Sequence, residues 1–251
     1  LASNSYIQGN RLHTGVFQLN SDWTDSFSTE MRGFYKNYVR IQDPLLGRGF
    51  AEMQVCTAPT SDRPAVLTAG NTTSINCPST SATISFGPDI SRQTNALRVE
   101  NFGGLLQGRL KLGDHDVKAF VEFQDVKTFN SFVQRSSGQY YFDSRADVQA
   151  RTAQRFRYQT NPVTFNANDA AASFRYQAYV LGLQDSWRVT DTLNVDLGVR
   201  YDFYGGSSRP VLNPVFAARY GFDNTRYVNG LGVFQPRFGF TFKPMRELSF
   251  R

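Results

Sequence analysis

The most constraining feature of this chain is a strict alternation of apolar and polar side chains over residues 193–203. The segment reads Leu-Asn-Val-Asp-Leu-Gly-Val-Arg-Tyr-Asp-Phe. Because side chains point alternately to the two faces of a β-strand, one face is apolar or aromatic and the other carries polar side chains, charges and glycine. The alternation lasts for about the ten residues that a tilted strand needs to cross a bilayer. The segment therefore predicts a strand with lipid on one side and water on the other.

The same pattern recurs along the chain. It is found in residues 27–41, 101–112, 117–124, 176–187 and 237–243, less cleanly in 11–19, and a further strand begins near Leu248. The segment 27–41 places four charges on one face and none on the other. We therefore count about eight strands.

The connections between these strands alternate in length. Short ones lie at residues 21–25, 113–116, 190–192 and 243–247, and long ones fill about 43–96, 130–172 and 204–232. Bacterial outer-membrane barrels have this organisation, with short turns in the periplasm and long loops outside the cell. We predict an all-β fold, an antiparallel up-and-down transmembrane β-barrel, with the three long segments as extracellular loops, the first of which lacks a core of its own.

The bulk composition is compatible with such a barrel. The mean hydropathy of −0.41 is low, but a barrel exposes only every second residue to lipid, so bulk hydropathy does not report the membrane. The chain has no run of 18 apolar residues, which excludes a transmembrane helix. A soluble all-β binding module, with the apolar faces buried in a sandwich, is the alternative from another class.

The two ends of the chain suggest a piece of a longer protein. Leu1 is not followed by a basic segment and an apolar core, as in a signal peptide, and the last residues resemble the start of a strand. An open arc of eight strands would leave two unpaired edges in hydrocarbon, which membranes do not tolerate. We therefore expect residues 1–251 to be a partial barrel that is closed by further strands.

Cys56 and Cys77 are the only cysteines, 21 positions apart in the first long loop. An oxidising compartment would join them in a disulfide. Two free thiols are the alternative, and zinc is disfavoured because no histidine is near either cysteine. We predict the disulfide.

Residues 179–202 resemble the barrel hairpin of TonB-dependent outer-membrane receptors. The matching elements are a turn that contains Gln184, Asp185 and Trp187, followed by a strand that reads Leu-Gly-Val-Arg-Tyr-Asp at 197–202. The segment 235–244, with its Pro-Arg-Phe-Gly, is similar to the next strand and turn of that family. Residues 142–150 are similar to an extracellular element of the Oar-like, carboxypeptidase-regulatory-like branch.

This resemblance implies a barrel of 22 strands, a plug domain in its lumen, and energy delivered through the protein TonB. The plug and the terminal strand would lie outside residues 1–251, so TonB and the plug are expected partners of the complete protein. The implied function is import of a scarce solute, such as a metal chelate, a glycan or a peptide, across a bacterial outer membrane by a multi-pass protein. A passive porin and an adhesin are the alternatives.

The charged face of the predicted strands faces the lumen and is basic. Its positive residues are Arg32, Lys36, Arg40, Arg109, Lys111, Lys118, Arg200, Arg237 and Lys243, and its negative residues are Glu30, Glu122, Asp196 and Asp202. This leaves an excess of five positive charges out of the net +6 of the chain, which argues against nucleic acid as a partner. The lining is predicted either to attract an anionic solute or, as we favour, to pair with acidic groups of the plug.

Aromatic and basic residues mark the predicted membrane interfaces. Trp23 and Trp187 adjoin short turns, as expected of a periplasmic aromatic girdle, and Tyr35, Tyr201 and Phe203 would belong to the opposite girdle. A separate basic patch in the second long loop comprises Arg145, Arg151, Arg155 and Arg157. This patch either binds lipopolysaccharide phosphates or is an ordinary solvated loop.

The sequence offers no support for catalysis. His13 and His115 are isolated, and the chain has no phosphate-binding glycine loop and no Gly-x-Ser-x-Gly motif. Asp185 beside Trp187 is interpreted as a polar residue near the membrane interface. We therefore expect a protein that is not an enzyme and that has no metal site and no cofactor.

Overall fold

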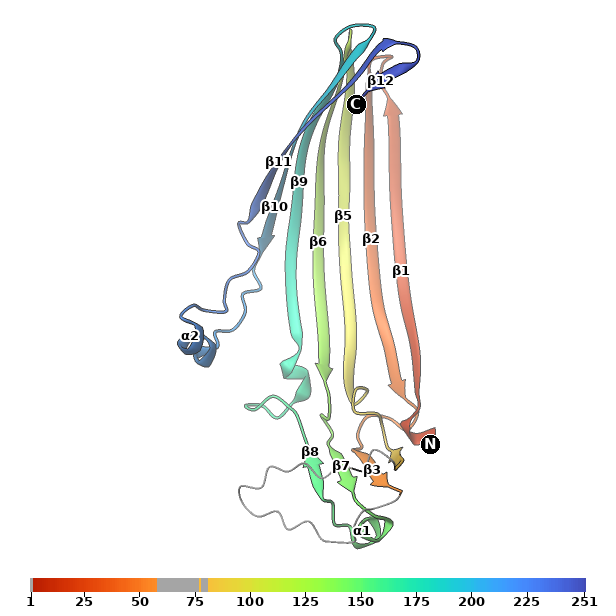
Figure 1. Cartoon of the computed structure of the whole chain (residues 1–251), viewed down its shortest axis with the longest axis vertical. Coiled ribbons are helices and arrows are strands. Elements are labelled where there is room, and N and C mark those ends of the chain that lie inside the picture. The colour runs from red at the N-terminus through yellow and green to blue at the C-terminus, as the bar shows by residue number, and fades with distance from the viewer. Residues whose placement is uncertain (1, 58–76, 78–80) are drawn as a thin grey trace. The chain divides into compact units, whose positions relative to one another are not determined.

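A computed structural model describes residues 2–57, 77 and 81–251, and its main element is an eight-stranded antiparallel sheet (Figure 1). Neighbours in the sheet follow the order β1-β2-β5-β6-β9-β10-β11-β12. The strands are β1 Tyr6–Asp22, β2 Phe27–Pro44, β5 Thr94–Leu112, β6 His115–Val133, β9 Ala172–Arg188, β10 Leu193–Gly206, β11 Gly232–Met245 and β12 Leu248–Phe250. The all-β fold class and the up-and-down order of eight strands are confirmed.

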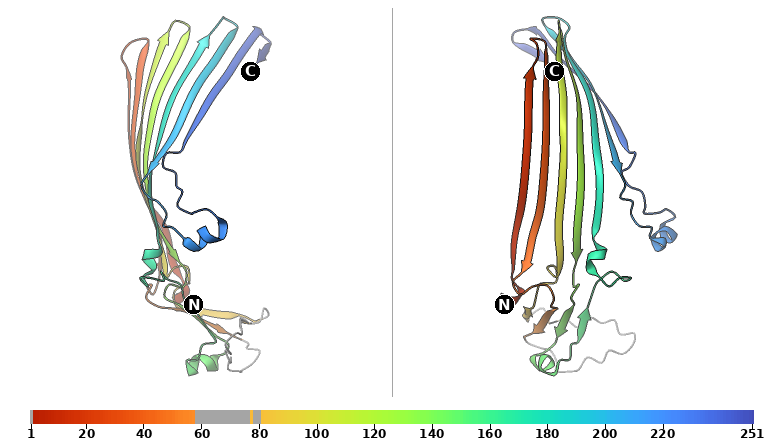
Figure 2. Two further views of the ribbon diagram at one scale, coloured as in Figure 1. Left: turned by 90° about the vertical axis from the view of Figure 1, so that its left-hand side faces the viewer. Right: turned by 180° about the vertical axis from the view of Figure 1, so that it is seen from behind.

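Short and long connections alternate between the strands, and the short turns lie together at one end of the sheet (Figure 2). The predicted turn 113–116 is wrong in extent, because β6 already begins at His115 and Asp116 belongs to the strand. The turn consists of Gly113 and Asp114 alone. Gly113 has a φ of 60°, which the first position of a two-residue hairpin turn requires and which glycine adopts without strain.

Several strands are longer than the alternating segments that predict them. β2 has 18 residues, and β5 and β6 have 19 each. β11 includes Pro236, which precedes the alternating segment 237–243 and cannot donate a hydrogen bond from its backbone nitrogen. Pro236 pairs with Val199 of β10, whereas β12 pairs with β11 only at Phe242 and Met245. Pro236 therefore lies in a part of β11 that does not pair with β12, so no hydrogen bond to β12 is lost.

The chain forms two compact units. Unit 1 comprises Leu1–Arg11, Tyr38–Arg98 and Phe129–Ala172, and unit 2 comprises Leu12–Asn37, Val99–Thr128 and Ser173–Arg251. Unit 2 contains the short turns and the helix α2 Pro214–Tyr220. Unit 1 contains the helix α1 Arg145–Ala150 and two 3-10 turns, η1 Ala2–Asn4 and η2 Ala167–Ala170.

Unit 1 also contains a second sheet that the sequence does not predict. It has the order β4-β3-β7-β8 and is built from β3 Glu52–Cys56, β4 Thr83–Phe86, β7 Gln139–Phe142 and β8 Arg155–Arg157. Val55 and Phe142 are 7% exposed, and Tyr141 is 2% exposed. The expectation that the first long loop lacks a core of its own is therefore wrong, because its strands and those of the second long loop bury apolar side chains together.

Both α-helices are short and begin with a side-chain cap. The Ser144 hydroxyl accepts a hydrogen bond from the Asp147 backbone N–H, and the Asn213 side chain accepts one from that of Phe216. Such caps satisfy N–H groups that the first helical turn leaves free. In the described part of the chain, no helix is long and apolar enough to span a membrane.

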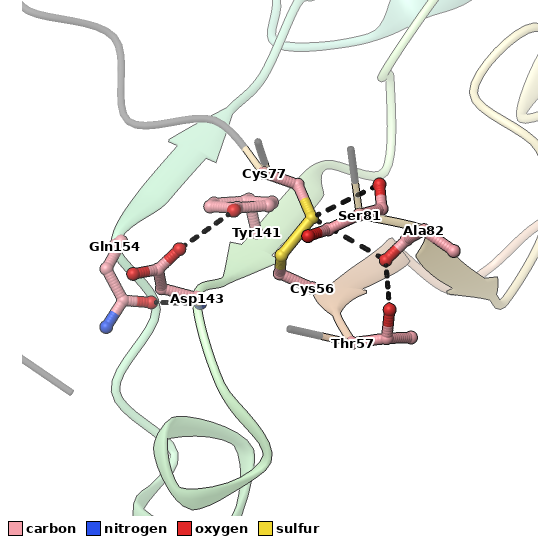
Figure 3. The surroundings of a disulfide bond; sticks show 8 residues. All are labelled: Cys56, Thr57, Cys77, Ser81, Ala82, Tyr141, Asp143 and Gln154. Carbon is pink, nitrogen blue, oxygen red and sulfur yellow. Dashed lines mark hydrogen bonds between the residues drawn. A yellow bond between two sulfur atoms is a disulfide. The ribbon is translucent and has the colours of Figure 1, made fainter. Parts of the chain in front are cut away.

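The predicted disulfide is confirmed. Cys56, at the end of β3, is bonded to Cys77, with a distance of 5.4 Å between the two Cα atoms (Figure 3). Thr57 donates a hydrogen bond from its hydroxyl to the carbonyl of Ala82 at 2.8 Å. This hydrogen bond links the residue after Cys56 to the segment after Cys77, next to the disulfide. The remainder of the predicted first loop at 58–76 and 78–80 lies outside the described residues.

Removal of this disulfide should destabilise the second sheet. A covalent link over a loop of this size removes unfolded-state entropy equivalent to about 3 kcal/mol. The double variant C56S/C77S should therefore show faster amide hydrogen exchange in β3 and β4 than the native protein, while exchange in β9 and β10 of unit 2 should be unchanged. Equal protection of β3 in both proteins would contradict a stabilising role.

Glu52 is a buried acid at the start of the same sheet. It is 3% exposed, and its carboxylate accepts hydrogen bonds from Gln139 Nε2 at 2.5 Å and from Asn4 Nδ2 at 3.1 Å. Burial raises the pKa of Glu52 above its ordinary value of 4.5, and the two amide donors oppose this only in part. The folded unit therefore favours the protonated acid more than the unfolded chain does.

The stability of unit 1 should consequently depend on pH. The stabilisation from the neutral acid is fully present below pH 4.5 and is lost as the pH rises through the higher folded-state pKa. Hydrogen exchange of β3 and β7, corrected for intrinsic rates, should show protection that falls over this range, with a smaller fall in E52Q. E100Q, which removes a carboxylate from unit 2, is the control. An identical pH dependence in E52Q and the native protein would refute the assignment.

Candidate functional site

The register of β9, β10 and β11 gives the sheet two chemically different faces. Residues paired across antiparallel strands share a face, and Leu193, Val195 and Leu197 pair with Phe242, Phe240 and Phe238. We call this the apolar face. On the other, the charged face, Gly198 pairs with Arg237 of β11 and with Gln184 of β9.

A hollow of about 300 Å³ lies on the charged face of unit 2. Its polar lining residues are Lys118, Gln184, Asp196, Arg200 and Arg237, which come from β6, β9, β10 and β11. Gly198 and Gly239 also line it, and the absence of side chains at these two positions leaves the space open. The lining therefore joins three positive side chains to one carboxylate and one amide.

One wall of the hollow is an aromatic ring laid over a glycine. A Cβ atom added at Gly182 would lie only 2.1 Å from the Phe120 ring. Phe34 covers Gly103 in the same way, at 3.0 Å. Each glycine thus lets a ring from the neighbouring strand lie flat on the sheet. This contact holds Phe120 beside Lys118 at the edge of the hollow.

Several of the predicted lumen-facing charges are paired within the sheet. Arg200 donates to Asp202 with a shortest distance of 2.7 Å, and Arg109 donates from Nε to Asp116 at 2.7 Å. Arg32 forms a salt bridge with Glu30. These pairs bring an arginine and a carboxylate from the same strand or the next one together, so they neutralise each other locally.

The remaining positive charges are not neutralised in this way. Lys36, Lys111, Lys118, Arg237 and Lys243 have no salt bridge in the described part of the chain, and Arg40 donates to the Asn95 amide oxygen at 2.7 Å. Asp116 and Arg188 also lie on the charged face, although the sequence pattern did not indicate them. Their opposite charges offset each other.

On the apolar face, aromatic side chains form a row across four strands. Phe123 lies 5.8 Å from Phe102 and 5.2 Å from Tyr179, and Phe203 lies 4.7 Å from Tyr179 and 5.7 Å from Tyr201, between ring centroids. Tyr201 and Phe203 are predicted girdle residues. The other three were missed because only the cross-strand register shows that they lie side by side.

Charged residues follow this row immediately on the long-loop side. Asp125 lies two residues beyond Phe123 in β6 and is 4% exposed. Arg175 donates to Asp125 at 2.8 Å, and Gln177 donates to it at 2.8 Å. The apolar face thus ends in a polar layer whose charges are paired, as expected at a membrane–water boundary.

A second polar cluster lies on the apolar face near the short turns. His115 Nδ1 is 2.8 Å from Asp185 Oδ2, and the His115 ring stacks on Trp187 with 5.2 Å between centroids. The prediction that His115 is isolated is therefore wrong. Asp185 is 70 positions away in sequence, so spacing along the chain could not show this pair.

These two polar layers delimit an apolar band. Eight residues separate Asp185 from Gln177 in β9, and ten separate His115 from Asp125 in β6. At about 3.4 Å per residue these distances are roughly 27 and 34 Å along the strands. Strands tilted by about 40° would then cover roughly 20 to 26 Å across the membrane, close to the height of about 25 Å that is typical of transmembrane barrels.

The other predicted interface residues are exposed. Trp23 is 66% exposed and donates from Nε1 to the Thr29 hydroxyl at 2.8 Å, and Tyr35 is 48% exposed. The four arginines of the predicted loop patch lie within or next to two elements, Arg145 and Arg151 at α1 and Arg155 and Arg157 in β8. Arg155 lies over the Tyr141 ring at 5.0 Å.

A cluster of metal-binding side chains is absent from the described residues. Residues 2–57, 77 and 81–251 contain no group of three or more histidine, cysteine, aspartate or glutamate side chains that could hold a metal ion. The polar side chains that line the hollow on the charged face are arginine, lysine, amide and carboxylate groups, which form hydrogen bonds and ion pairs.

Comparison with known proteins identifies the family. The family model described as "Outer membrane beta barrel domain" matches residues 3–251. No curated protein matches the chain. The chain therefore belongs to the outer-membrane β-barrel domain family, and its location is the outer membrane.

The two faces can be tested with a matched pair of substitutions in β6. Val121 lies between His115 and Asp125 on the apolar face, whereas Gln124 lies beside a hollow on the charged face. V121R should destabilise the protein folded in lipid vesicles by about 2 to 4 kcal/mol, since arginine near the bilayer midplane is costly. Q124R makes the same change in charge and should cost much less in a denaturant titration. Equal costs would refute this orientation of the faces.

Proposed function

Because the chain belongs to the outer-membrane β-barrel domain family, we propose that it is part of a TonB-dependent receptor. In this proposal the strands belong to a larger barrel of 22 strands that crosses a bacterial outer membrane many times. The lumen holds a plug domain, and the complete protein imports a scarce solute with energy from TonB. The protein has no enzymatic activity in this proposal, and its surroundings are outer-membrane lipid and lipopolysaccharide.

The observation that supports this proposal most is the convergence of the receptor-like motifs on one hollow. Gln184 belongs to the motif that was predicted as a turn and that lies within β9, Arg200 to the strand motif that follows it, and Arg237 to the motif of the next strand. All three line the hollow of about 300 Å³ on the charged face. Residues that carry the resemblance thus form a common surface, which is what a binding role in the lumen requires.

The charge of this surface indicates the kind of partner. Arg200 is neutralised by Asp202, and Asp196 accepts a hydrogen bond from the Ser186 hydroxyl at 2.6 Å. Lys118 and Arg237 are therefore the positive lining residues without a salt bridge among the described residues, and they outnumber the one lining carboxylate, Asp196. We propose that they pair with acidic groups of the plug in the resting protein. An anionic solute that concentrates along the same lining is the second way in which this charge could be used.

The extracellular ends fit a receptor better than a bare pore. The first two long connections form a sheet with buried Tyr141 and Phe142, which is closed by the Cys56–Cys77 disulfide. Structured loops of this kind place side chains at fixed positions, as ligand recognition requires.

The proposal can be tested on the complete protein in two assays. Inserted into a planar lipid bilayer, a receptor closed by its plug should give no steady ion conductance, whereas a passive porin should give open-channel steps. Cells that produce the protein should take up at least one of three labelled probes, namely ferric citrate, a maltodextrin or an oligopeptide. This uptake should stop when an uncoupler collapses the proton gradient.

Each alternative has its own signature in these assays. Steady conductance with uptake that is insensitive to the uncoupler would identify a porin and refute the proposal. Absence of uptake for all three probes, together with absence of conductance, would favour an adhesin. Extraction of the protein from membranes without detergent would favour a soluble module.

A further inference from the structure

Two arginines in unit 1, Arg11 and Arg98, lie on the apolar face of the sheet. In β2 and β5, Arg40 donates to Asn95 at 2.7 Å and Asn95 donates to Gln42 at 2.6 Å, so these three side chains share the charged face. Residues of the opposite parity lie on the apolar face. Arg98 is therefore on the apolar face of β5.

The neighbouring strand β1 repeats this exception. Tyr38 of β2 donates to Asn10 of β1 at 2.8 Å, which places Asn10 on the charged face together with the even-numbered residues of β2. Arg11 follows Asn10 and must point to the apolar face. Arg11 and Arg98 thus lie on the face that carries most of the apolar side chains of the sheet.

Both arginines line a single hollow within unit 1. Its volume is about 390 Å³, and its lining includes Arg11, Arg48, Arg98, Asp43, Val39 and Ile41. Among the described residues, Asp43 is the only acidic one that lines it. Arg40 and Leu97 also line the hollow, so it combines four guanidinium groups with three branched apolar side chains.

Arg48 is held in place, whereas Arg11 and Arg98 are free to bind. Arg48 donates to the Gln42 carbonyl at 2.6 Å, to the Asn95 carbonyl at 3.3 Å and to the Asp43 carboxylate at 2.7 Å. Among the described residues, Arg11 and Arg98 have neither a hydrogen bond nor a salt bridge from their side chains, and both are exposed. The one carboxylate is thus already engaged by Arg48.

Other charges on the apolar face are treated differently. In unit 2, Asp125 pairs with Arg175, Glu100 pairs with Lys127, and His115 pairs with Asp185. Pairing reduces the cost of a charge that lies near lipid. An arginine on the lipid side destabilises the folded protein strongly at the bilayer midplane and only slightly near the interface. Two unpaired arginines that line one hollow therefore fit a position near the membrane interface, where an external anion can neutralise them.

We propose that this hollow binds the phosphate groups of an anionic membrane lipid. Arginine presents a planar fork of N–H donors that matches phosphate oxygens in pairs. Val39 and Ile41 provide apolar contact beside these groups. The occupant is a lipid because Arg11, Arg98, Val39 and Ile41 lie on the face that we assign to lipid, and the inference rests on that part of the proposed function. It does not depend on TonB or on transport.

The test measures binding of fluorescent lipid A to the detergent-solubilised complete protein by anisotropy. Lipid A carries phosphate groups, and its dephosphorylated form keeps the same acyl chains, so the pair isolates the phosphate contribution. The native protein should bind lipid A more tightly than the dephosphorylated form. R11Q/R98Q should weaken lipid A binding by at least about tenfold, the size expected for loss of charge-assisted hydrogen bonds. R11K/R98K should retain part of the affinity and shows that the variants fold.

The control variant K36Q/K111Q removes two positive charges from the charged face and should bind lipid A as the native protein does. The proposal is overturned if R11Q/R98Q binds normally, or if K36Q/K111Q loses as much affinity. It is also overturned if inorganic phosphate displaces lipid A at an equal concentration, since the site would then serve a soluble anion. Uncoupler-sensitive uptake should be unchanged in R11Q/R98Q, so failure of the lipid site and failure of the transport proposal give different results.

Discussion

The backbone hydrogen bonds between antiparallel neighbours are the constraint on which the rest of this structure depends. In hydrocarbon, an unpaired N–H or carbonyl group costs several kcal/mol, so a strand can cross a membrane only when each edge is paired. Pairing fixes the register, and the register decides which side chains meet. Leu197, for example, faces Phe238 because β10 and β11 pair in one particular way. A shift by one residue would turn every apolar side chain of a strand toward the lumen.

The same register converts an alternation along each strand into layers across the sheet. Phe123, Tyr179 and Phe203 come from three strands and are far apart in sequence, yet their rings are in contact. Asp125 and its partner Arg175 lie one step further along the apolar face. An apolar band, an aromatic row and a polar layer therefore follow one another in the order in which a membrane changes from hydrocarbon to headgroups.

The difference between alternation along one strand and register between strands explains what the sequence could predict. Alternation with period 2 is local, so the strands, their two faces and the alternation of short and long connections are readable from residues alone. The disulfide is predictable because only two cysteines exist. In contrast, the pairing of His115 with Asp185 and the parallel pairing of β3 with β7 join segments that are far apart in the chain. The strands of the second sheet have three to five residues, too few to show a period.

The distribution of paired and unpaired charges on the sheet indicates which partners the sheet can bind. Where an arginine has a carboxylate beside it, as in Arg200 with Asp202, the pair satisfies itself and predicts no ligand. Unpaired cations are informative because their surroundings determine which kind of anionic group can pair with them. Lys118 and Arg237 line a hollow on the charged face, where water and a folded partner can enter. Arg11 and Arg98 lie on the apolar face, where an anion must come with an apolar body. The two pairs of cations, Lys118 with Arg237 and Arg11 with Arg98, therefore fit partners of different chemistry, because the two faces of the sheet are in different environments.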